Sequence, residues 1–158
     1  MAKSQVSRRW VYGVKISILK VGRIAYPEIR ILAGIYEERL KPFSKLQGID
    51  VKDDAAAIKF LRALSPGHRI LLLDERGPLW TSPQLAQNIR SLSDDPSVKS
   101  LTFVIAGPMG PTPELRSMFH ETWSLSKATL TSDMAWLLVW EQIYRAFSIL
   151  KGTGYHHD

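Results

Sequence analysis

The chain has 158 residues, 45% of them hydrophobic, so it is long enough for one compact domain and too short for two ordinary ones. Lys and Arg number 21 against 15 Asp and Glu, and the net charge of +6 favours a polyanionic partner such as nucleic acid or an anionic membrane surface. The absence of cysteine excludes disulfides, thiolate zinc sites and cysteine nucleophiles.

Residues 1–13 have the composition of a basic arm. Lys3, Arg8 and Arg9 are not followed by the apolar stretch of a signal peptide, and no apolar run in the chain is long enough to span a bilayer. We therefore expect a cytoplasmic protein without a membrane partner, with a flexible arm over residues 1–13 and a single domain over residues 14–158. The arm could contact RNA or could have no role.

Hydrophobic periodicity predicts strands and helices in alternation through the first half of the chain. Apolar and polar residues alternate over residues 14–21, as in a strand, and Pro27 then begins a helix that ends before Pro42. A short strand near residues 49–51 follows. It leads to a helix capped by Asp53 and Asp54 and stopped by the Pro-Gly pair at 66–67.

The second half continues this alternation. A continuous apolar run, residues 70–73, predicts a strand that is buried on both faces, and residues 101–105 predict another buried strand. Between them Ser82 caps a helix begun by Pro83, and Thr112 with Pro113 repeats this signal. A short strand near residues 124–126 precedes a last helix over residues 132–150. The order indicates an α/β fold, with a mostly parallel sheet flanked by helices on both faces.

The last helix is apolar nearly all round, and such a helix needs cover on several sides. We predict a homodimer that packs through this helix; the alternative is central burial within one chain. The apolar residues concerned are Met134, Trp136, Leu137, Leu138, Val139, Trp140, Ile143, Tyr144, Phe147, Ile149 and Leu150.

Several common catalytic classes lack their motifs. The four histidines form no HExxH and no cluster with carboxylates at ligand spacing, so we predict no metal site. There is no GxSxG elbow, no Walker A loop and no GxGxxG after the first strand. The most informative segment is the loop Ala106–Gly110, directly after a buried strand. Ligands of open α/β sheets bind at such strand ends, so this loop is either a small-molecule site or an ordinary tight turn.

Four blocks of sequence carry a resemblance to a known family. They are Phe103–Gly110, Leu125–Thr129, Glu141–Phe147 and Gly152–His156, and the segments Lys15–Arg23 and Tyr36–Leu40 extend them upstream. In order and spacing they resemble the SPOUT-class methyltransferases that modify N3 of a pseudouridine in large-subunit (23S) ribosomal RNA. The resemblance covers nearly everything after Gly13.

The resemblance implies a carboxyl-terminal part threaded as a deep trefoil knot, with S-adenosylmethionine held in the knot largely by backbone groups. It also implies a dimer through the last helix and a substrate that is ribosomal RNA or the assembled ribosome. The matching positions for the cofactor are Leu73, Ala106, Gly107, Gly110, Leu125, Ser126, Lys127, Ala128, Thr129 and Leu130.

The implied reaction transfers the sulfonium methyl group to a ring nitrogen, which needs alignment and loss of the N3 proton. By resemblance, the catalytic region contains Glu141, Tyr144, Arg145, Tyr155 and His156, with His156 as the candidate for proton handling. Structural roles are the alternative. Tyr144 could belong to the core, and Glu141 could simply pair with Arg145 one helical turn away.

The sequence departs from the family's pattern near the expected active site. Paired glycines are replaced by Ala106-Gly107, a Pro-His-Gln stretch is replaced by Thr131-Ser132-Asp133, and Trp136 stands where arginine is usual. The segment between Lys45 and Ala55 is also shorter. A catalytically impaired relative that acts as a dimeric RNA- or ribosome-binding protein is therefore the alternative function, and binding of S-adenosylmethionine discriminates the two.

Overall fold

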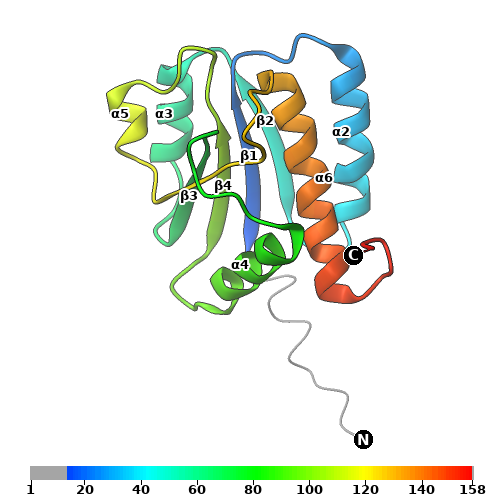
Figure 1. Ribbon diagram of the computed structural model, residues 1–158. Coiled ribbons are helices and arrows are strands. Elements are labelled where there is room, and N and C mark those ends of the chain that lie inside the picture. The colour runs from blue at the N-terminus through cyan, green and yellow to red at the C-terminus, as the bar shows by residue number, and fades with distance from the viewer. Residues whose placement is uncertain (1–13, 158) are drawn as a thin grey trace, which may run out of the picture.

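A sheet with strand order β2-β1-β4-β3-β5 runs through the middle of the computed structural model, which describes residues 14–157 (Figure 1). The strands are β1 (Lys15–Val21), β2 (Leu46–Val51), β3 (His68–Leu73), β4 (Ser100–Ile105) and β5 (Glu121–Trp123). All neighbouring pairs are parallel, so every strand ends at the same edge of the sheet. The prediction of a mostly parallel sheet is confirmed.

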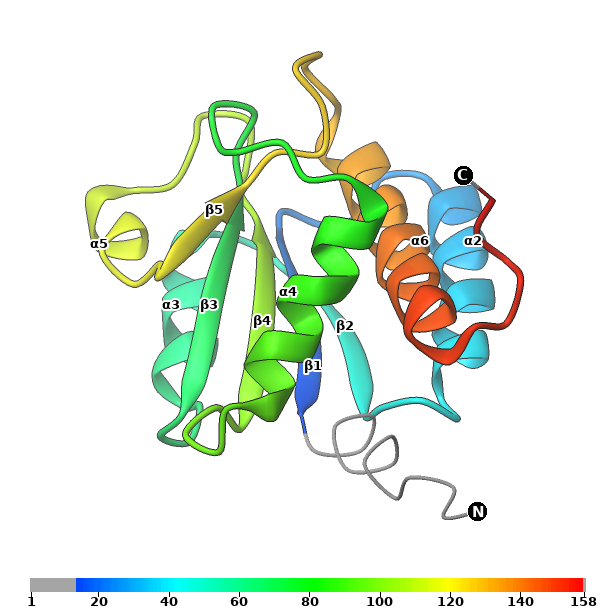
Figure 2. The ribbon, with the colours of Figure 1, turned by 60° about the horizontal axis from the view of Figure 1, so that its bottom comes forward.

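Helices cover both faces of this sheet. They are α2 (Pro27–Leu40), α3 (Asp54–Arg62), α4 (Ser82–Asp94), α5 (Pro113–Arg116) and α6 (Ser132–Lys151). Figures 1 and 2 show α2, α4 and α6 on one face and α3 and α5 on the other. The core divides accordingly: Phe103 and Trp140 lie in the cluster under α2, α4 and α6, and Leu61 and Leu115 lie in the cluster under α3 and α5.

The capping residues explain where most helices begin. Asp53, Thr112 and Thr131 each accept a hydrogen bond from a backbone amide in the first turn of the helix that follows. The prediction for α4 is wrong by one residue, because Thr81 rather than Ser82 is the cap. Thr81 and Gln84 exchange side-chain and backbone hydrogen bonds, a capping box that satisfies two amides at once.

The predicted strand at residues 124–126 is also wrong, because β5 occupies residues 121–123. Its partner β3 ends at Leu73, so pairing stops there apart from an isolated bridge between Ser124 and Leu79. The Ser124 hydroxyl donates to the carbonyl of Ser126 at 2.8 Å, which turns the chain. The chain then runs across the carboxyl edge of the sheet to α6. The trefoil threading of this segment stays a prediction.

Other elements of the same chain cover most of the apolar surface of α6. Trp136, Trp140, Ile143 and Phe147 are all buried, since α6 packs between α2 and α4 and against β1 and β4. Central burial, the alternative to a dimer, therefore accounts for most of this helix. Gly48 on β2 makes room for the indole rings, because a Cβ there would lie 2.7 Å from Trp140 and 2.8 Å from Trp136.

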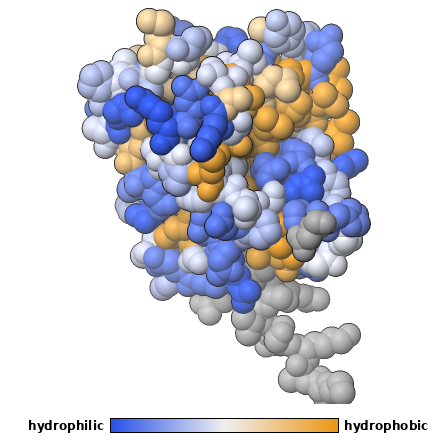
Figure 3. Space-filling view, viewed as in Figure 1, coloured by the Kyte–Doolittle hydropathy of each residue, from blue (hydrophilic) through white to orange (hydrophobic). Residues whose placement is uncertain are grey.

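Exposed apolar side chains gather at α2 and at the first turn of α6. Figure 3 shows a hydrophobic area over these two helices. Its exposed members are Tyr26, Ile31, Leu32, Ile35 and Met134, which we call the α2 patch.

The predicted basic arm, residues 1–13, lies outside the described residues. Between residues 14 and 157, no helix is long and apolar enough to cross a membrane.

Candidate active site

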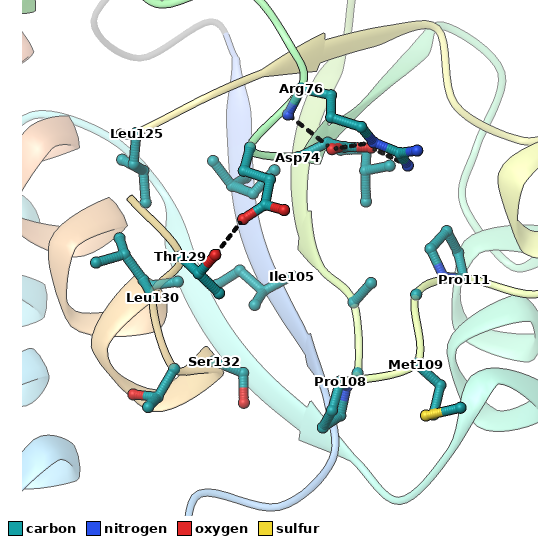
Figure 4. A pocket seen from close by; sticks show the side chains of 18 of the residues that line it. Asp74, Arg76, Ile105, Pro108, Met109, Pro111, Leu125, Thr129, Leu130 and Ser132 are labelled. Atoms are coloured by element: carbon teal, nitrogen blue, oxygen red, sulfur yellow. Dashed lines mark hydrogen bonds and ion pairs between the residues drawn. The ribbon is translucent and has the colours of Figure 1, made fainter. Parts of the chain in front are cut away.

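A pocket of about 810 Å³ lies where β3, β4 and β5 end. Three chain segments line it: residues 72–76 at the end of β3, residues 105–111 with Arg116 at the end of β4, and residues 125–132 without Lys127, together with Ala135, after β5. Figure 4 shows Pro108, Met109 and Pro111 on one side and Leu125, Thr129 and Leu130 on the other. Parallel pairing puts the ends of β3 and β4 side by side, which is why loops distant in the sequence meet here.

The pocket gathers nearly all the positions predicted for the cofactor. Those that line it are Leu73, Ala106, Gly107, Gly110, Leu125, Ser126, Ala128, Thr129 and Leu130. Lys127 is not among the lining residues. An ideal Cβ on Gly107 would meet only Val21 Cγ1, at 3.9 Å, so the backbone there is open to a bound molecule.

Charged side chains occupy the β3 side of the pocket. Asp74 accepts hydrogen bonds from the backbone amide of Arg76 at 2.9 Å and from its guanidinium at 3.2 and 3.3 Å. These bonds, with Arg116 further away, lower the pKa of Asp74 despite its partial burial. Glu75 accepts a hydrogen bond from the Thr129 hydroxyl at 2.8 Å, which joins the loop after β3 to the loop after β5 (Figure 4).

The predicted catalytic residues form a separate polar cluster on the second half of α6 and the tail that follows. Arg145 donates to Glu141 Oε1 from Nε at 3.0 Å and from Nη2 at 2.6 Å. The guanidinium carbon of Arg145 lies 4.8 Å from the ring centroid of Tyr155. The rings of Tyr144 and Tyr155 meet edge to face at 4.7 Å. The structure therefore brings four of the predicted residues into direct contact.

His156, the fifth, joins the cluster through Arg145, whose Nη1 lies 3.4 Å from the ring Nδ1. A guanidinium can only donate, so Nδ1 accepts and the proton of a neutral His156 sits on Nε2. In this arrangement Nε2 of the ring is a donor and Nδ1 is an acceptor.

Both ionisable partners in the centre of the cluster are held in one protonation state. Burial, with hydrogen bonds to Tyr36 and Glu141, raises the pKa of Tyr155 to about 12. The hydrogen-bonded carboxylate of Glu141 raises the pKa of Arg145. At neutral pH this cluster therefore presents a guanidinium cation and a neutral phenol.

The pocket and the polar cluster lie apart. Within the described chain, none of the five predicted catalytic residues lines the pocket. Ala135, the pocket residue furthest along α6, lies six residues before Glu141, a rise of about 9 Å.

The structure adds residues that sequence reasoning did not assign. Asp74, Glu75 and Arg76 follow β3 directly, and the rule that selected the loop after β4 could have selected them too. Tyr36 and Arg39 of α2 join the polar cluster, since the Arg39 guanidinium lies 5.7 Å from the ring centroids of both Tyr36 and Tyr144. The block Tyr36–Leu40, which shares in the family resemblance, is the sequence feature that could have identified them.

Comparison with known proteins agrees with this arrangement. The family model described as "Predicted SPOUT methyltransferase" matches residues 14–156. The ribosomal RNA large subunit methyltransferase H of Geobacter sp. (strain M21) is 33% identical over 155 residues, which covers 92% of this chain and 100% of the relative. The protein of the same name from Gloeobacter violaceus is 31% identical over 154 residues, covering 91% and 99%.

Solved structures support the fold. A probable methyltransferase from Bordetella pertussis Tohama I superposes with a TM-score of 0.56 at 16% identity, over 90% of this chain and 99% of its own. A probable methylase family protein from Haemophilus influenzae Rd KW20 gives 0.54 at 12% identity, over 94% and 72%. The family model and the curated relatives both cover most of the chain, and the chain belongs to the SPOUT methyltransferase family.

Proposed function

We propose that this protein transfers a methyl group from S-adenosylmethionine to N3 of a pseudouridine in large-subunit (23S) ribosomal RNA. The observation that carries the proposal is the convergence of Leu73, Gly107 and Leu125, from three separate loops, on one pocket. The family match begins at residue 14, which supports a single methyltransferase domain over residues 14–158. A ribosomal substrate implies that the protein works in the cytoplasm.

The pocket suits S-adenosylmethionine, the methyl donor of the SPOUT family. Its volume of about 810 Å³ lies within the range of small-molecule sites, about 300–1,000 Å³. The apolar walls from Leu73, Leu125 and Leu130 suit the adenine ring, and the open backbone at Gly107 offers hydrogen-bonding groups. When bound, the cofactor supplies an activated methyl group on a sulfonium, whose departure leaves a neutral thioether.

We assign the polar cluster to the handling of the target base. Loss of the N3 proton to solvent water leaves negative charge on the ring, and a fixed cation in a sheltered site stabilises such charge. Arg145 is that cation, since Glu141 and Tyr155 fix its position. His156 donates from Nε2 in the same region, and Tyr155 stays neutral as a hydrogen-bond donor.

The separation of the cluster from the pocket supports a homodimer. Methyl transfer requires the reacting atoms to approach within about 3.5 Å, which a cluster that begins about 9 Å further along α6 than the pocket does not provide from the same chain. A two-fold interface places the same surface of each copy against the other. The α2 patch, with Ile31, Leu32 and Ile35 exposed, offers apolar area for such an interface along α2 and α6. The polar cluster of one copy would then serve the pocket of the other.

Binding and transfer test the proposal together. Calorimetry should show that the purified protein binds S-adenosylmethionine. Radiolabelled cofactor should then mark N3 of a pseudouridine in large ribosomal subunits from cells that lack this chain, as mapped by mass spectrometry of RNA fragments. Absence of cofactor binding at millimolar concentration would refute the enzyme and favour a binding protein.

Mixing two inactive variants tests the composite site. Gly107→Trp fills the pocket, and Arg145→Ala removes the cation while leaving the pocket intact. Each variant alone should be inactive, and a mixed dimer, verified by native mass spectrometry, should recover activity because one of its two sites has both parts. Mixed dimers without activity would show that the cluster and the pocket do not cooperate across an interface.

A further inference from the structure

A buried ion pair joins β1 to the first turn of α6, next to the pocket. Lys20 Nζ lies 3.3 Å from Asp133 Oδ1, and the two side chains are only 2% and 8% exposed. Neither residue lines the pocket or belongs to the polar cluster. The functional assignments made above leave this pair without a role.

Both side chains of the pair also make hydrogen bonds to backbone groups. Lys20 Nζ also donates to the carbonyl oxygens of Gly22 at 2.9 Å and Arg23 at 3.4 Å. Asp133 Oδ2 accepts from the backbone amides of Ala25 at 2.9 Å and Tyr26 at 3.2 Å. The pair therefore connects three segments: the end of β1, the loop from β1 to α2, and the start of α6.

The connected segments bear directly on two walls of the pocket. Lys20 lies opposite Ile105 in the register of β1 and β4, and Ile105 lines the pocket. Asp133 follows Ser132, which lines the pocket from the other side, together with Ala135 one turn later. The ion pair thus sets how the wall made by α6 sits relative to the wall made by β4.

Stability alone is a poor reason for such a pair. Removing two charges from water is expensive, and well-packed apolar groups often give equal or greater stability in the same place. A buried pair that also makes four hydrogen bonds to the backbone does, however, specify one geometry. Lys20 provides the opposite charge that the burial of Asp133 requires.

We propose that Lys20 and Asp133 are positioning residues for the cofactor pocket: their ion pair locks the first turn of α6 and the loop of residues 22–26 to the end of β1. The proposal rests on the proposed function, in that the ligand positioned is S-adenosylmethionine. The pair acts through Ser132, Ala135 and Ile105 and does not touch the ligand.

The informative variant is the double change Lys20→Met with Asp133→Asn. Met fills the space of the lysine stem, and the Asn oxygen can still accept from the Ala25 or Tyr26 amide, so no buried charge remains. The single change Lys20→Met leaves the buried charge of Asp133 without its cation and could prevent folding. The double variant removes both charges, so it keeps the test decisive. The control is Ser44→Ala, which removes a buried hydrogen bond of 2.8 Å to the Val14 carbonyl at the opposite end of β1.

The expected result separates geometry from stability. With both proteins fully folded, the double variant should bind S-adenosylmethionine about tenfold or more weakly, and Ser44→Ala should bind as the unaltered protein does. In steady state the loss should appear as a higher KM for the cofactor rather than a lower kcat. Unchanged affinity in a folded double variant, or a fall in kcat with KM unchanged, overturns the proposal.

Hydrogen exchange tests the same pair without a ligand, so failure of the proposed function does not hide the outcome. The double variant should lose protection at the amides of residues 25–26 and in the first turn of α6, while residues 140–150 stay protected. If the unaltered protein binds no S-adenosylmethionine, the proposed function fails, and this exchange pattern still decides whether the pair locks these segments. Equal protection in both proteins overturns the proposal.

Discussion

The hydroxyl of Tyr155 donates a hydrogen bond to Glu141 Oε1 at 3.2 Å, and so ties the tail after α6 back to the helix from which it departs. Gly152 makes this reversal possible, because it adopts φ +66° at the end of α6, a conformation that side chains disfavour. The same carboxylate oxygen receives the guanidinium of Arg145. One acceptor therefore positions both a cation and a phenol.

This contact predicts late ionisation of Tyr155. Its pKa is raised from 10.0 to about 12 by burial, Tyr36 and Glu141. A raised folded-state pKa means that this tyrosine stabilises the fold fully below pH 10, and that the contribution is lost as the pH rises from about 10 to about 12. Alkaline titration of phenolate absorbance should show a group that ionises late, and Tyr155→Phe should remove it.

Tyr26 provides the control for this titration, because its side chain is exposed at 63%. Tyr26→Phe should leave the late group in place. If Tyr155→Phe instead removes a group that titrates near pH 10, Tyr155 is not held neutral by its surroundings.

Gly107→Ala should weaken cofactor binding with little effect on stability. The added methyl group meets nothing closer than Val21 Cγ1 at 3.9 Å, and the backbone of Gly107 is not in the left-handed region, so the fold accepts it. The methyl group does, however, occupy space in the pocket. We expect an affinity for S-adenosylmethionine lower by about tenfold, or about 1.4 kcal/mol, by calorimetry.

Gly67→Ala is the matched control for Gly107→Ala, because it should lower stability and leave cofactor binding unchanged. Gly67 has φ +89°, and a Cβ there would lie 2.6 Å from the carbonyl oxygen of Ser97, far from the pocket. This variant should lose more than about 1 kcal/mol of stability and, where folded, bind the cofactor normally. A Gly107→Ala protein with unchanged affinity would mean that the ligand does not approach this loop.

Gly48→Ala should destabilise the fold through the tryptophans of α6. The new methyl group would lie 2.7 to 2.8 Å from Trp140 and Trp136, two buried rings that have no space to yield. Overpacking of this kind costs about 1–3 kcal/mol, measurable by urea denaturation. Gly34→Ala in α2 is the control: nothing lies within 4 Å of its Cβ, so alanine should stabilise the helix by about 0.5–1 kcal/mol. Equal effects of the two changes would contradict the packing assigned to Trp136.

Local signals were sufficient to predict the architecture. The largely apolar segments 70–73 and 101–105 located β3 and β4, and the predicted last helix agrees with α6 to within one residue, because hydrophobic periodicity depends on neighbours in sequence. Since parallel strands end together, the loops after β3 and β4 could also be expected to share a pocket. The strand β5 was misplaced because its three residues are defined by β3, not by a pattern of their own.

Contacts between distant residues could not be predicted in this way. Lys20 in a strand with alternating polarity suggests a solvent-facing residue, and only the fold shows Asp133 beside it. Likewise, Trp136 in place of the arginine that the resemblance implies suggests a lost function. Only the fold shows that its ring packs closely against Gly48. The distance between the pocket and the polar cluster also depends on three-dimensional placement, although both sets of residues were identified from sequence.

Asp74 predicts how the pocket responds to acid. Hydrogen bonds from Arg76 lower the pKa of this carboxyl below 3.8, so its contribution to stability is present above pH 3.8 and is lost as the pH falls through the lowered value. Asp74→Asn should therefore cost about 1 kcal/mol at neutral pH, a modest figure because Arg76 is largely solvent-exposed. As acid protonates the aspartate, the difference in stability between the two proteins should shrink. Urea denaturation at pH 7 and in steps down to pH 3 measures this convergence.

Asp94→Asn on α4, whose carboxylate lies 3.9 Å from Arg90 on the surface, is the control and should show almost no difference in stability at any of these pH values. A difference for Asp74→Asn that persists unchanged into acid would mean that packing of the side chain, rather than its charge, holds the loop after β3 in place.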